Sequence, residues 1–379
     1  MKKITFVILC LEGAVLSFNV AASAAIVPSI AFDFALSQFV VGKIIWLYML
    51  PYGVAALFYG PLVRAFDAKK IELVCMFLFA LANLLAGVAS SISALFTARF
   101  FMGLFGASVI PLGIILIAKH IEAKQRGRFV GIFFGSTFLA SLAGLALSGL
   151  IPWRMIYLIP GIAGLILTVL IYFYLPSFKQ DTGVFKIDYL STFKDKQVLV
   201  IFTYIFFISL IYHGIQQWLG VYFSTRFMLN QFFISMLITL TSLSGIFGEI
   251  TGGKLADSRG RVRTVSLGIM MMILSVFLLL LKVPPLILAL LMVIWGLGWT
   301  INHAAVSTML TDLPQRHVNE AASLNSGVRF ISGGLGAALG GVLMQKNYIL
   351  SFAVFGAGLV LLCLLDRKLL IVPQVRKTH

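Results

Sequence analysis

Apolar stretches of about twenty residues, separated by short polar segments, recur along the whole chain. A helix needs about 20 residues to cross the hydrocarbon core of a bilayer, and in lipid only helices and closed barrels satisfy their own backbone hydrogen bonds. Barrel strands alternate apolar and polar residues, whereas runs such as MMILSVFLLLL at 271–281 do not. The pattern predicts an all-α polytopic membrane protein with spans near 4–28, 38–59, 71–90, 94–118, 127–150, 155–176, 198–223, 232–252, 264–282, 286–310, 321–344 and 348–371.

Composition points to the same class. The chain is 60% hydrophobic and 11% charged, with a mean hydropathy of +1.03, whereas a soluble domain has about 25% charged residues. The N-terminal stretch resembles a secretory signal, but Glu12 interrupts it and it runs on to Pro28, so we interpret it as a retained first span. The three cysteines lie in apolar runs, where a thiol behaves as a small hydrophobe. No metal-ligand spacing is present, and we predict no metal and no cofactor.

The chain divides into two similar halves. The longest connection, at 176–197, is polar and separates six spans from six, which predicts an N-terminal bundle at 1–176, a linker at 177–197 and a C-terminal bundle at 198–379. GPLVRAFDAKK begins at residue 60 and GKLADSRGRVR at residue 253, a spacing of 193 residues. GRFVGIFFG at 127 and VRFISGGLG at 328 are 201 residues apart. Repetition at half the chain length is typical of transporters built from repeated bundles.

Basic residues set the predicted orientation. With twelve spans both termini lie on one face, and that face holds 22 Lys and Arg residues, including Lys2, Lys3 and those of 254–263. The opposite face holds five, namely Lys43, Arg154, Arg226, Lys282 and Lys346. Bases in short loops stay cytoplasmic, so we expect both termini and the central linker in the cytoplasm of a cell with a bacterial-type inner membrane. The net charge of +16 then needs no nucleic-acid partner.

The segment GKLADSRGR at 253–261 resembles the signature loop of the major facilitator superfamily. That loop lies between spans two and three and again between spans eight and nine. The second copy matches at Gly253, Asp257, Gly260 and Arg261, whereas the first has Arg64 in place of the acid. RFFMG at 99–103 is similar to the fourth-span motif of proton-coupled members, and PWRMIYLI at 152–159 to a Trp-Arg pair before span six. The pattern is most similar to drug/proton antiporters, although span five lacks their Gly-Pro pair.

The resemblance implies two six-helix bundles that rock about a central site, with the signature loops where the bundles meet the cytoplasm. An acid at Asp257 can complement the start of a neighbouring helix, and contacts formed in one state alone bias the conformational equilibrium. We therefore predict a conformational latch in the second half; the alternative is that these bases only set the topology. Its members are Gly253, Asp257, Gly260, Arg261 and Arg263, with Glu249 and Arg329 nearby in spans eight and eleven.

Ionisable and amide side chains within spans are the other candidates, because they are costly in lipid and usually face an interior cavity. Most lie in spans one, four, seven and ten, which the family arrangement places around the cavity. The proton-coupling candidates are Glu12, Arg99, His213 and His303. The substrate-binding candidates are Asn19, Gln216, Gln217, Trp218, Trp299 and Asn302. We expect Arg99 to bond to span one, at Asn19, and Asp366 to lie at a solvated helix end. Structural hydrogen bonding is the alternative for each candidate.

Together these patterns predict a secondary active transporter for a small organic solute. No GxxxxGK[ST] sequence occurs, which argues against ATP as the energy source, so coupling to protons is expected. Efflux by antiport is the favoured direction, with uptake by symport, facilitated diffusion or a non-transporting sensor as alternatives. No nucleophile–base or metal-ligand spacing predicts an enzyme. The expected partners are the substrate, protons and the lipid bilayer, with the chain as a monomer.

Overall fold

The twelve expected spans are all present. The computed structural model describes residues 3–177, 189, 193–311 and 315–370, and leaves out the side chains of residues 64, 123–124, 127, 311 and 315–323. Within those residues, twelve helical segments are long and apolar enough to cross a membrane, which confirms the all-helical polytopic prediction. Most of the linker predicted at 177–197 lies outside the described residues.

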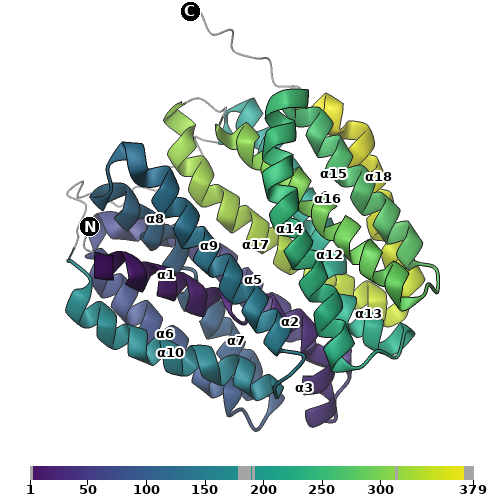
Figure 1. Cartoon of the computed structure of the whole chain (residues 1–379), viewed down its shortest axis with the longest axis horizontal. Coiled ribbons are helices and arrows are strands. Elements are labelled where there is room, and N and C mark those ends of the chain that lie inside the picture. Colours follow the sequence, from purple (N-terminus) through teal and green to yellow (C-terminus); the bar gives the residue numbers. More distant parts are fainter. Residues whose placement is uncertain (1–2, 178–188, 190–192, 312–314, 371–379) are drawn as a thin grey trace, which may run out of the picture.

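The helices form two groups of six spans that lie side by side (Figure 1). The first group contains α1 (Lys3–Ser17), α2 (Ala22–Ala25), α3 (Val27–Asp33), α4 (Gln38–Val41), α5 (Lys43–Ala65), α6 (Ala68–Gly87), α7 (Ile92–Gly106), α8 (Val109–His120), α9 (Ala123–Leu147) and α10 (Trp153–Tyr174). The second contains α12 (Lys196–Gln216), α13 (Leu219–Arg226), α14 (Gln231–Arg259), α15 (Arg261–Leu279), α16 (Pro285–Thr311), α17 (Gln315–Lys346) and α18 (Tyr348–Leu370).

Corresponding helices keep the spacing found in the sequence. The helices α1 and α12 begin at residues 3 and 196, α6 and α15 at 68 and 261, and α7 and α16 at 92 and 285, so each pair is 193 residues apart. The capping residues repeat as well. Ser37 accepts a hydrogen bond from Val40 N at the start of α4, and Asn230 accepts one from Phe233 N at the start of α14. Such caps satisfy backbone donors that the first helical turn leaves free.

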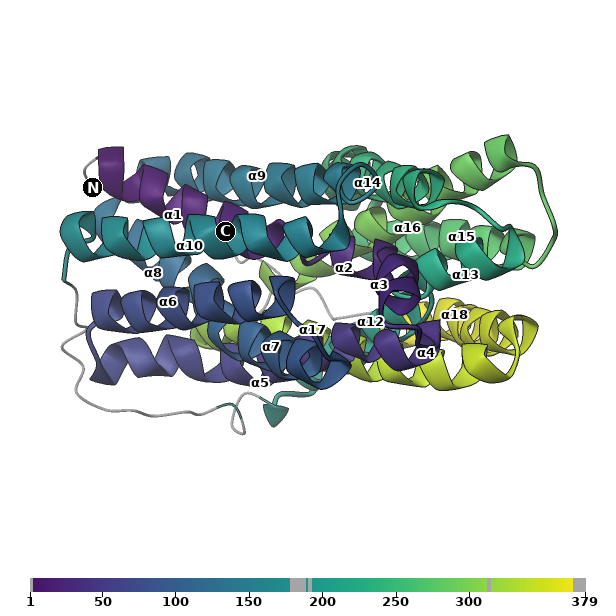
Figure 2. The same cartoon turned by 90° about the horizontal axis from the view of Figure 1, so that it is seen from below.

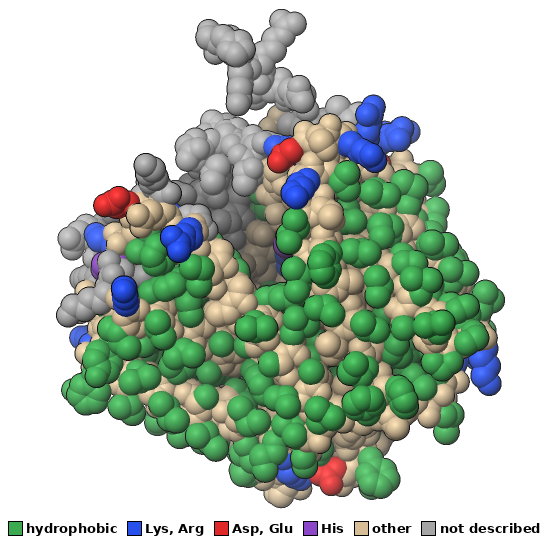
Figure 3. All heavy atoms as spheres, in the orientation of Figure 1, with side chains coloured by type: hydrophobic (Ala, Val, Ile, Leu, Met, Phe, Trp, Pro, Cys, Tyr) green, Lys and Arg blue, Asp and Glu red, His purple; other side chains and the backbone are tan. Residues whose placement is uncertain are grey.

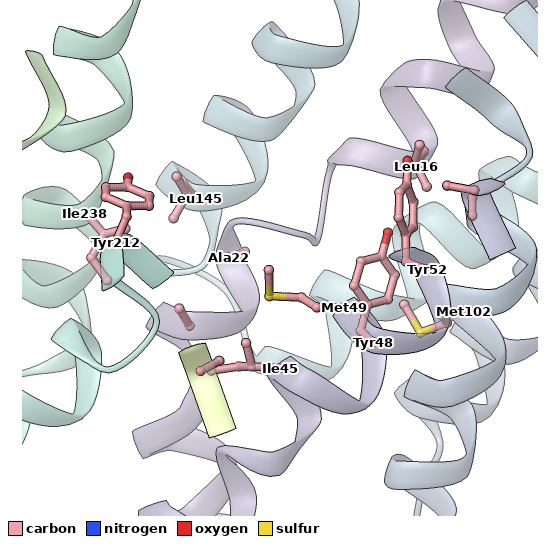
Figure 4. Packing of buried hydrophobic residues seen from close by; sticks show 14 of the residues in the cluster. Leu16, Ala22, Ile45, Tyr48, Met49, Tyr52, Met102, Leu145, Tyr212 and Ile238 are labelled. Carbon is pink, nitrogen blue, oxygen red and sulfur yellow. The ribbon is translucent and has the colours of Figure 1, made fainter. Parts of the chain in front are cut away.

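Close backbone packing joins the two groups along α5 and α17. A Cβ atom added at Gly53 would lie 2.7 Å from the backbone nitrogen of Ile331, and one at Gly327 would lie 3.2 Å from the carbonyl oxygen of Gly53. The ring of Tyr52 stacks on that of Phe330, with centroids 4.0 Å apart. Small residues at such contacts are typical of membrane helix packing. Figure 4 shows Met49 and Ile45 on one side of this boundary region and Tyr212 on the other.

At one end the boundary is tied by a polar network centred on Gln231, at the start of α14. Its Nε2 donates to Ala25 O at 3.0 Å and Ser148 O at 3.4 Å, and its Oε1 accepts from Ser29 at 2.7 Å. Ser148 Oγ also lies 2.9 Å from Ser235 Oγ. Figure 2 shows α2 and α3 at this boundary, beside α13. We call Ser29, Ser148, Gln231 and Ser235, with the Ala25 carbonyl, the end network.

The opposite end is open. Figure 3 shows a hollow between the two groups at the upper edge, where most of the visible Lys and Arg side chains gather. The end network lies away from this edge, because α3, which carries Ser29, is at the lower edge of Figure 1. Among the described residues, the two groups are therefore joined at one end and separated by a hollow at the other.

The signature segment is more helical than a turn between spans would be. The helix α14 continues to Arg259 and α15 begins at Arg261, so only Gly260 separates them. Its φ of 89° lies in the region that glycine adopts readily. Gly253 is within α14, and no atom lies near enough to meet an added Cβ there. A tight turn thus requires Gly260 and not Gly253.

Candidate functional site

Glu12 faces a second acid inside the first group. Glu12 on α1 and Glu72 on α6 are both fully buried, and the two carboxyl groups are neighbours that influence each other electrostatically. Among the described residues, no other donor bonds to either carboxyl group. We call these two residues the acid pair. A buried charge without a partner is strongly unfavourable, so this pair is the most unusual polar feature of the first half.

The structure contradicts the predicted bond between Arg99 and Asn19. Arg99 Nε donates to Ile44 O of α5 at 2.9 Å, and its guanidinium lies 4.5 Å from the ring centroid of Tyr48. Asn19 Nδ2 instead donates to Asn83 Oδ1 of α6 at 2.6 Å. Arg99 therefore reaches the second span, where its guanidinium packs on an aromatic face and its Nε bonds to a main-chain carbonyl. Arg99 and Asn19 occupy separate places.

The second half brings together residues that we had predicted for three different roles. His303 Nδ1 on α16 lies 3.0 Å from Glu249 Oε1 on α14. The ring centroids of Trp299 and of His213 on α12 are 5.8 Å apart. The guanidinium carbon of Arg329 on α17 lies 6.0 Å from the Trp299 ring centroid. We call His213, Glu249, Trp299, His303 and Arg329 the second-half cluster. All five side chains retain some exposure, which leaves the cluster accessible from the space between helices.

An aromatic stack supports this cluster. Tyr212 lies between two indoles, with ring centroids 3.8 Å from Trp299 and 5.2 Å from Trp295, and both pairs are nearly parallel. Trp295 Nε1 donates to Gln216 Oε1 at 2.7 Å. Stacked rings of this kind are stabilising beyond their buried area. The bond fixes Gln216 on the buried side of the stack, while Trp299, at its other end, remains partly exposed.

The remaining predicted substrate contacts lie apart from the second-half cluster. Trp218 is 2% exposed and its Nε1 donates to Ala337 O at 2.7 Å, while its ring packs against Gly42 of the first group. Asn302 is buried and its Nδ2 donates to Tyr204 OH at 2.5 Å. Gln217 is half-buried at the end of α12. The surroundings of Trp218 and Asn302 are those of packing residues.

Asp366 does not lie at a solvated helix end, as the sequence had indicated. It is fully buried, and its Oδ2 accepts a hydrogen bond from Ser266 Oγ of α15 at 2.5 Å. The basic neighbours Arg367 and Lys368 follow on the exposed face of α18. One helix end thus has a solvated side and a buried side, and Asp366 faces inward.

The predicted latch residues are found at the open end. Asp257 is mostly exposed and its Oδ1 lies 3.6 Å from Arg261 Nη1, four residues further along the chain. Arg329 Nε donates to Asn325 Oδ1 at 2.7 Å. The side chains at the start of α17, where we expected Asp257 to bind, lie outside the described residues. The latch therefore stays a prediction, and Arg263 has the exposed position expected of a residue beside it.

Three important polar residues escaped sequence reasoning, namely Glu72, Asn83 and Gln231, and a fourth, Asp366, was placed wrongly at a solvated helix end. Attention to spans one, four, seven and ten did not find the first three, because they lie in spans three and eight. Glu72 and Asn83 could have been found by asking which spans other than those four contain ionisable or amide groups. Gln231 gave no signal, since a glutamine at a span boundary is ordinary.

One further cavity has no connection with these residues. It holds about 310 Å³ and lies beside α12, lined mainly by phenylalanines and leucine, among them Phe202, Phe206 and Leu199. Its described lining has one hydroxyl group, that of Thr203, and no ionisable side chain. An apolar pocket of this kind does not explain the buried acids or the second-half cluster.

Two similar six-span groups, joined at one end and separated by a hollow at the other, are typical of transporters built from repeated bundles. The family model described as Major Facilitator Superfamily matches residues 9–340 and 227–378. The chain belongs to this superfamily, which confirms the resemblance seen in its signature loop.

Its relatives and structural neighbours are transporters. The MFS-type transporters YbcL and YwfA of Bacillus subtilis (strain 168) are 24% and 25% identical; the matches cover 96% and 88% of this chain and 96% and 83% of theirs. The crystal structure of a D-xylose-proton symporter matches with a TM-score of 0.77 at 14% identity, covering 98% of both chains. At such identity the structural likeness shows the fold alone. The family makes the chain a multi-pass membrane transporter.

Proposed function

We propose that the chain is a proton-coupled secondary active transporter that moves a small organic solute across the inner membrane by alternating access, with efflux by antiport as the favoured direction. The main observation in support is that the boundary between the two groups differs at its two ends. The end network joins them at one end, while a hollow opens between them at the other. In the proposed orientation the termini are cytoplasmic, so the hollow faces the cytoplasm.

The second-half cluster is the proposed substrate wall. It offers the exposed part of the Trp299 indole, the guanidinium of Arg329 and the imidazoles of His213 and His303. A flat aromatic face favours a planar ligand, and a guanidinium favours an oxyanion. A planar organic molecule with an acidic group fits this wall best. Glu249 bonds to His303 and would select against a second negative charge near it.

Efflux draws its support from relatives. A puromycin resistance protein of Streptomyces alboniger is 32% identical over 132 residues, which is 34% of this chain. Symport remains the second candidate, because the D-xylose-proton symporter has the same fold. A non-transporting sensor is the third, and the eroded first signature loop with Arg64 favours it. Directional flux measurements separate all three.

The decisive experiment is flux in proteoliposomes with an imposed pH gradient. A thermal-shift screen of the purified chain first identifies a ligand among planar organic acids and drugs. We then expect that ligand to accumulate against its gradient when the pH gradient has one sign and not the other. Flux that ignores the pH gradient contradicts proton coupling. A bound ligand with no flux in either direction supports the sensor.

Glu12→Gln tests the proton-coupling role. The amide has the shape of the acid but cannot exchange a proton, so we expect gradient-driven accumulation to fall at least tenfold. Exchange of labelled for unlabelled ligand, which needs no net proton movement, should persist in part. Asp366→Asn is the matched control, because Asp366 is an equally buried acid that already has a hydroxyl donor. Full accumulation by the Glu12 variant would remove Glu12 from the mechanism.

A further inference from the structure

The acid pair lacks every ordinary means of supporting charge. Both side chains are 0% exposed, and neither receives a hydrogen bond from another described residue. Among the described residues, no basic side chain has a notable electrostatic effect on either carboxyl group, whereas the two carboxyl groups affect each other. Two carboxylates that share a buried site cannot both ionise without a large cost. A proton between them removes the repulsion and supplies the missing donor.

The nearest polar hydrogens are already used. Tyr59 of α5 and Cys75 of α6 lie close enough to Glu72 to feel its charge. Tyr59 OH, however, donates to Leu104 O at 2.9 Å, and Cys75 Sγ donates to Tyr59 OH at 3.4 Å. Both hydrogens are therefore engaged elsewhere in this structure, and neither is donated to the carboxyl groups.

We propose that Glu12 and Glu72 form one proton-binding site. A proton is shared between the two carboxyl groups while the end of the molecule that holds the end network is closed. Binding joins the two oxygens through the proton. Release transfers the proton to water and leaves two carboxylates, which water must then solvate. Because both side chains are sealed in this conformation, release requires α1 and α6 to separate.

The fold connects such a movement to the end network. The helix α1, which carries Glu12, ends at Ser17, and a turn separates it from α2. Asn19 in that turn is bonded to Asn83 of α6, the helix that also carries Glu72. Beyond it, α2 presents the Ala25 carbonyl to Gln231, and α3 presents Ser29. A shift of α1 on proton loss is therefore transmitted to the contacts that close the outer end.

The role of this site in transport rests on the proposed proton coupling, but its existence can be tested without transport. The thermal unfolding midpoint is measured from neutral to alkaline pH for four proteins: the unaltered pair, Glu12→Gln, Glu72→Gln and the double variant. All four carry Asp366→Asn, so that this third buried acid does not contribute to the pH dependence. A group that holds a proton only in the folded state stabilises the fold less as pH rises. We expect the unfolding midpoint of the protein with the unaltered pair to fall by several degrees more, between neutral and alkaline pH, than that of the double variant.

Pairing has its own signature in these variants. Either single change removes the like charge and introduces an amide donor, so each alone should abolish most of the pH-dependent loss, and the double variant should add little. Additive single effects would indicate two independent acids and overturn the shared site. Parallel pH profiles for wild type and double variant would overturn it as well.

Infrared difference spectroscopy covers the case in which a variant does not fold. The unaltered pair should show the C=O band of a protonated carboxyl group at neutral pH, and that band should disappear on alkalinisation. Its absence overturns the shared site.

If the stability signature is present but flux ignores the pH gradient, the proton site stands and the proposed coupling fails. If flux follows the gradient without that signature, the coupling stands and the shared site fails.

Discussion

Individual buried polar residues distinguish this transporter from a generic bundle. Glu12, Glu72 and Asp366 are all fully buried acids, yet they differ in what faces them. Asp366 has a serine donor, whereas the two glutamates have each other. Burying an acid with a donor costs little compared with burying it opposite another acid. The side chain opposite each acid therefore separates Asp366, which has a donor, from the two glutamates proposed to share a proton.

Arg99 illustrates a positioning role at the same scale. It donates to Ile44 O and lies over the ring of Tyr48. Arg99→Lys keeps the charge but loses the Nε donor and the planar group that packs on the ring. We expect this variant to lose about 1–3 kcal/mol of stability, measured as a lower thermal midpoint in detergent. Arg226→Lys, at an exposed arginine that donates to Leu280 O at 3.4 Å, is the control and should change the midpoint less.

At the scale of elements, the contacts that cross between the groups matter most. The α5–α17 contact is made by glycines and stacked rings, and it runs along the boundary. The end network is polar and is confined to one end. Rigid close packing suits an axis about which the groups rock, whereas a few hydrogen bonds can be broken and remade at small net cost.

Gln231→Ala tests the end network. The change removes the bonds to Ala25 O, Ser148 O and Ser29 together, so we expect the closed end to open more often. A cysteine placed near Ser235 should then react with a thiol reagent several times faster, provided that the native cysteines have been replaced. Asn230→Ala is the matched control, because Asn230 caps the same helix without crossing the boundary. Equal rates for both variants would contradict a closing role.

Asp257→Asn tests the latch. In the closed-end conformation the Asp257 side chain is 75% exposed and pairs only loosely with Arg261, so the change should not disturb this state. A latch formed in the opposite state would be lost, and we expect slower turnover and a population shifted toward the state seen here. Arg64→Ala, at the equivalent place in the first half, should have the smaller effect. Equal and mild effects on flux would leave these charges with a topological role alone.

At the scale of the whole molecule, the charge asymmetry and the open end belong to one orientation. The uneven distribution of Lys and Arg in the sequence predicts which face is cytoplasmic. Most of the basic side chains visible in Figure 3 gather at the edge where the hollow opens. Both observations support a cytoplasm-facing cavity in this conformation.

Topology labelling tests this orientation directly. With the native cysteines replaced, a cysteine near residue 2 and another near residue 185 should both be shielded from an impermeant thiol reagent in intact cells. A cysteine near Leu229, between α13 and α14, should react. Reaction at only one of the first two positions would mean an odd number of spans between them and would overturn the two-bundle topology.

The sequence by itself determined the twelve spans, the repeat of 193 residues and the superfamily, because length, hydropathy and loop charge are local properties that lipid enforces on each segment. It also placed His213, Trp299 and Arg329 among the candidates, though in separate roles. Only the tertiary structure decided that they share one cluster, that Asp366 is buried, and that Glu12 faces Glu72. Those facts depend on which face of each helix packs against its neighbour. That packing is set by contacts between segments far apart in the sequence, so it cannot be inferred from any one segment.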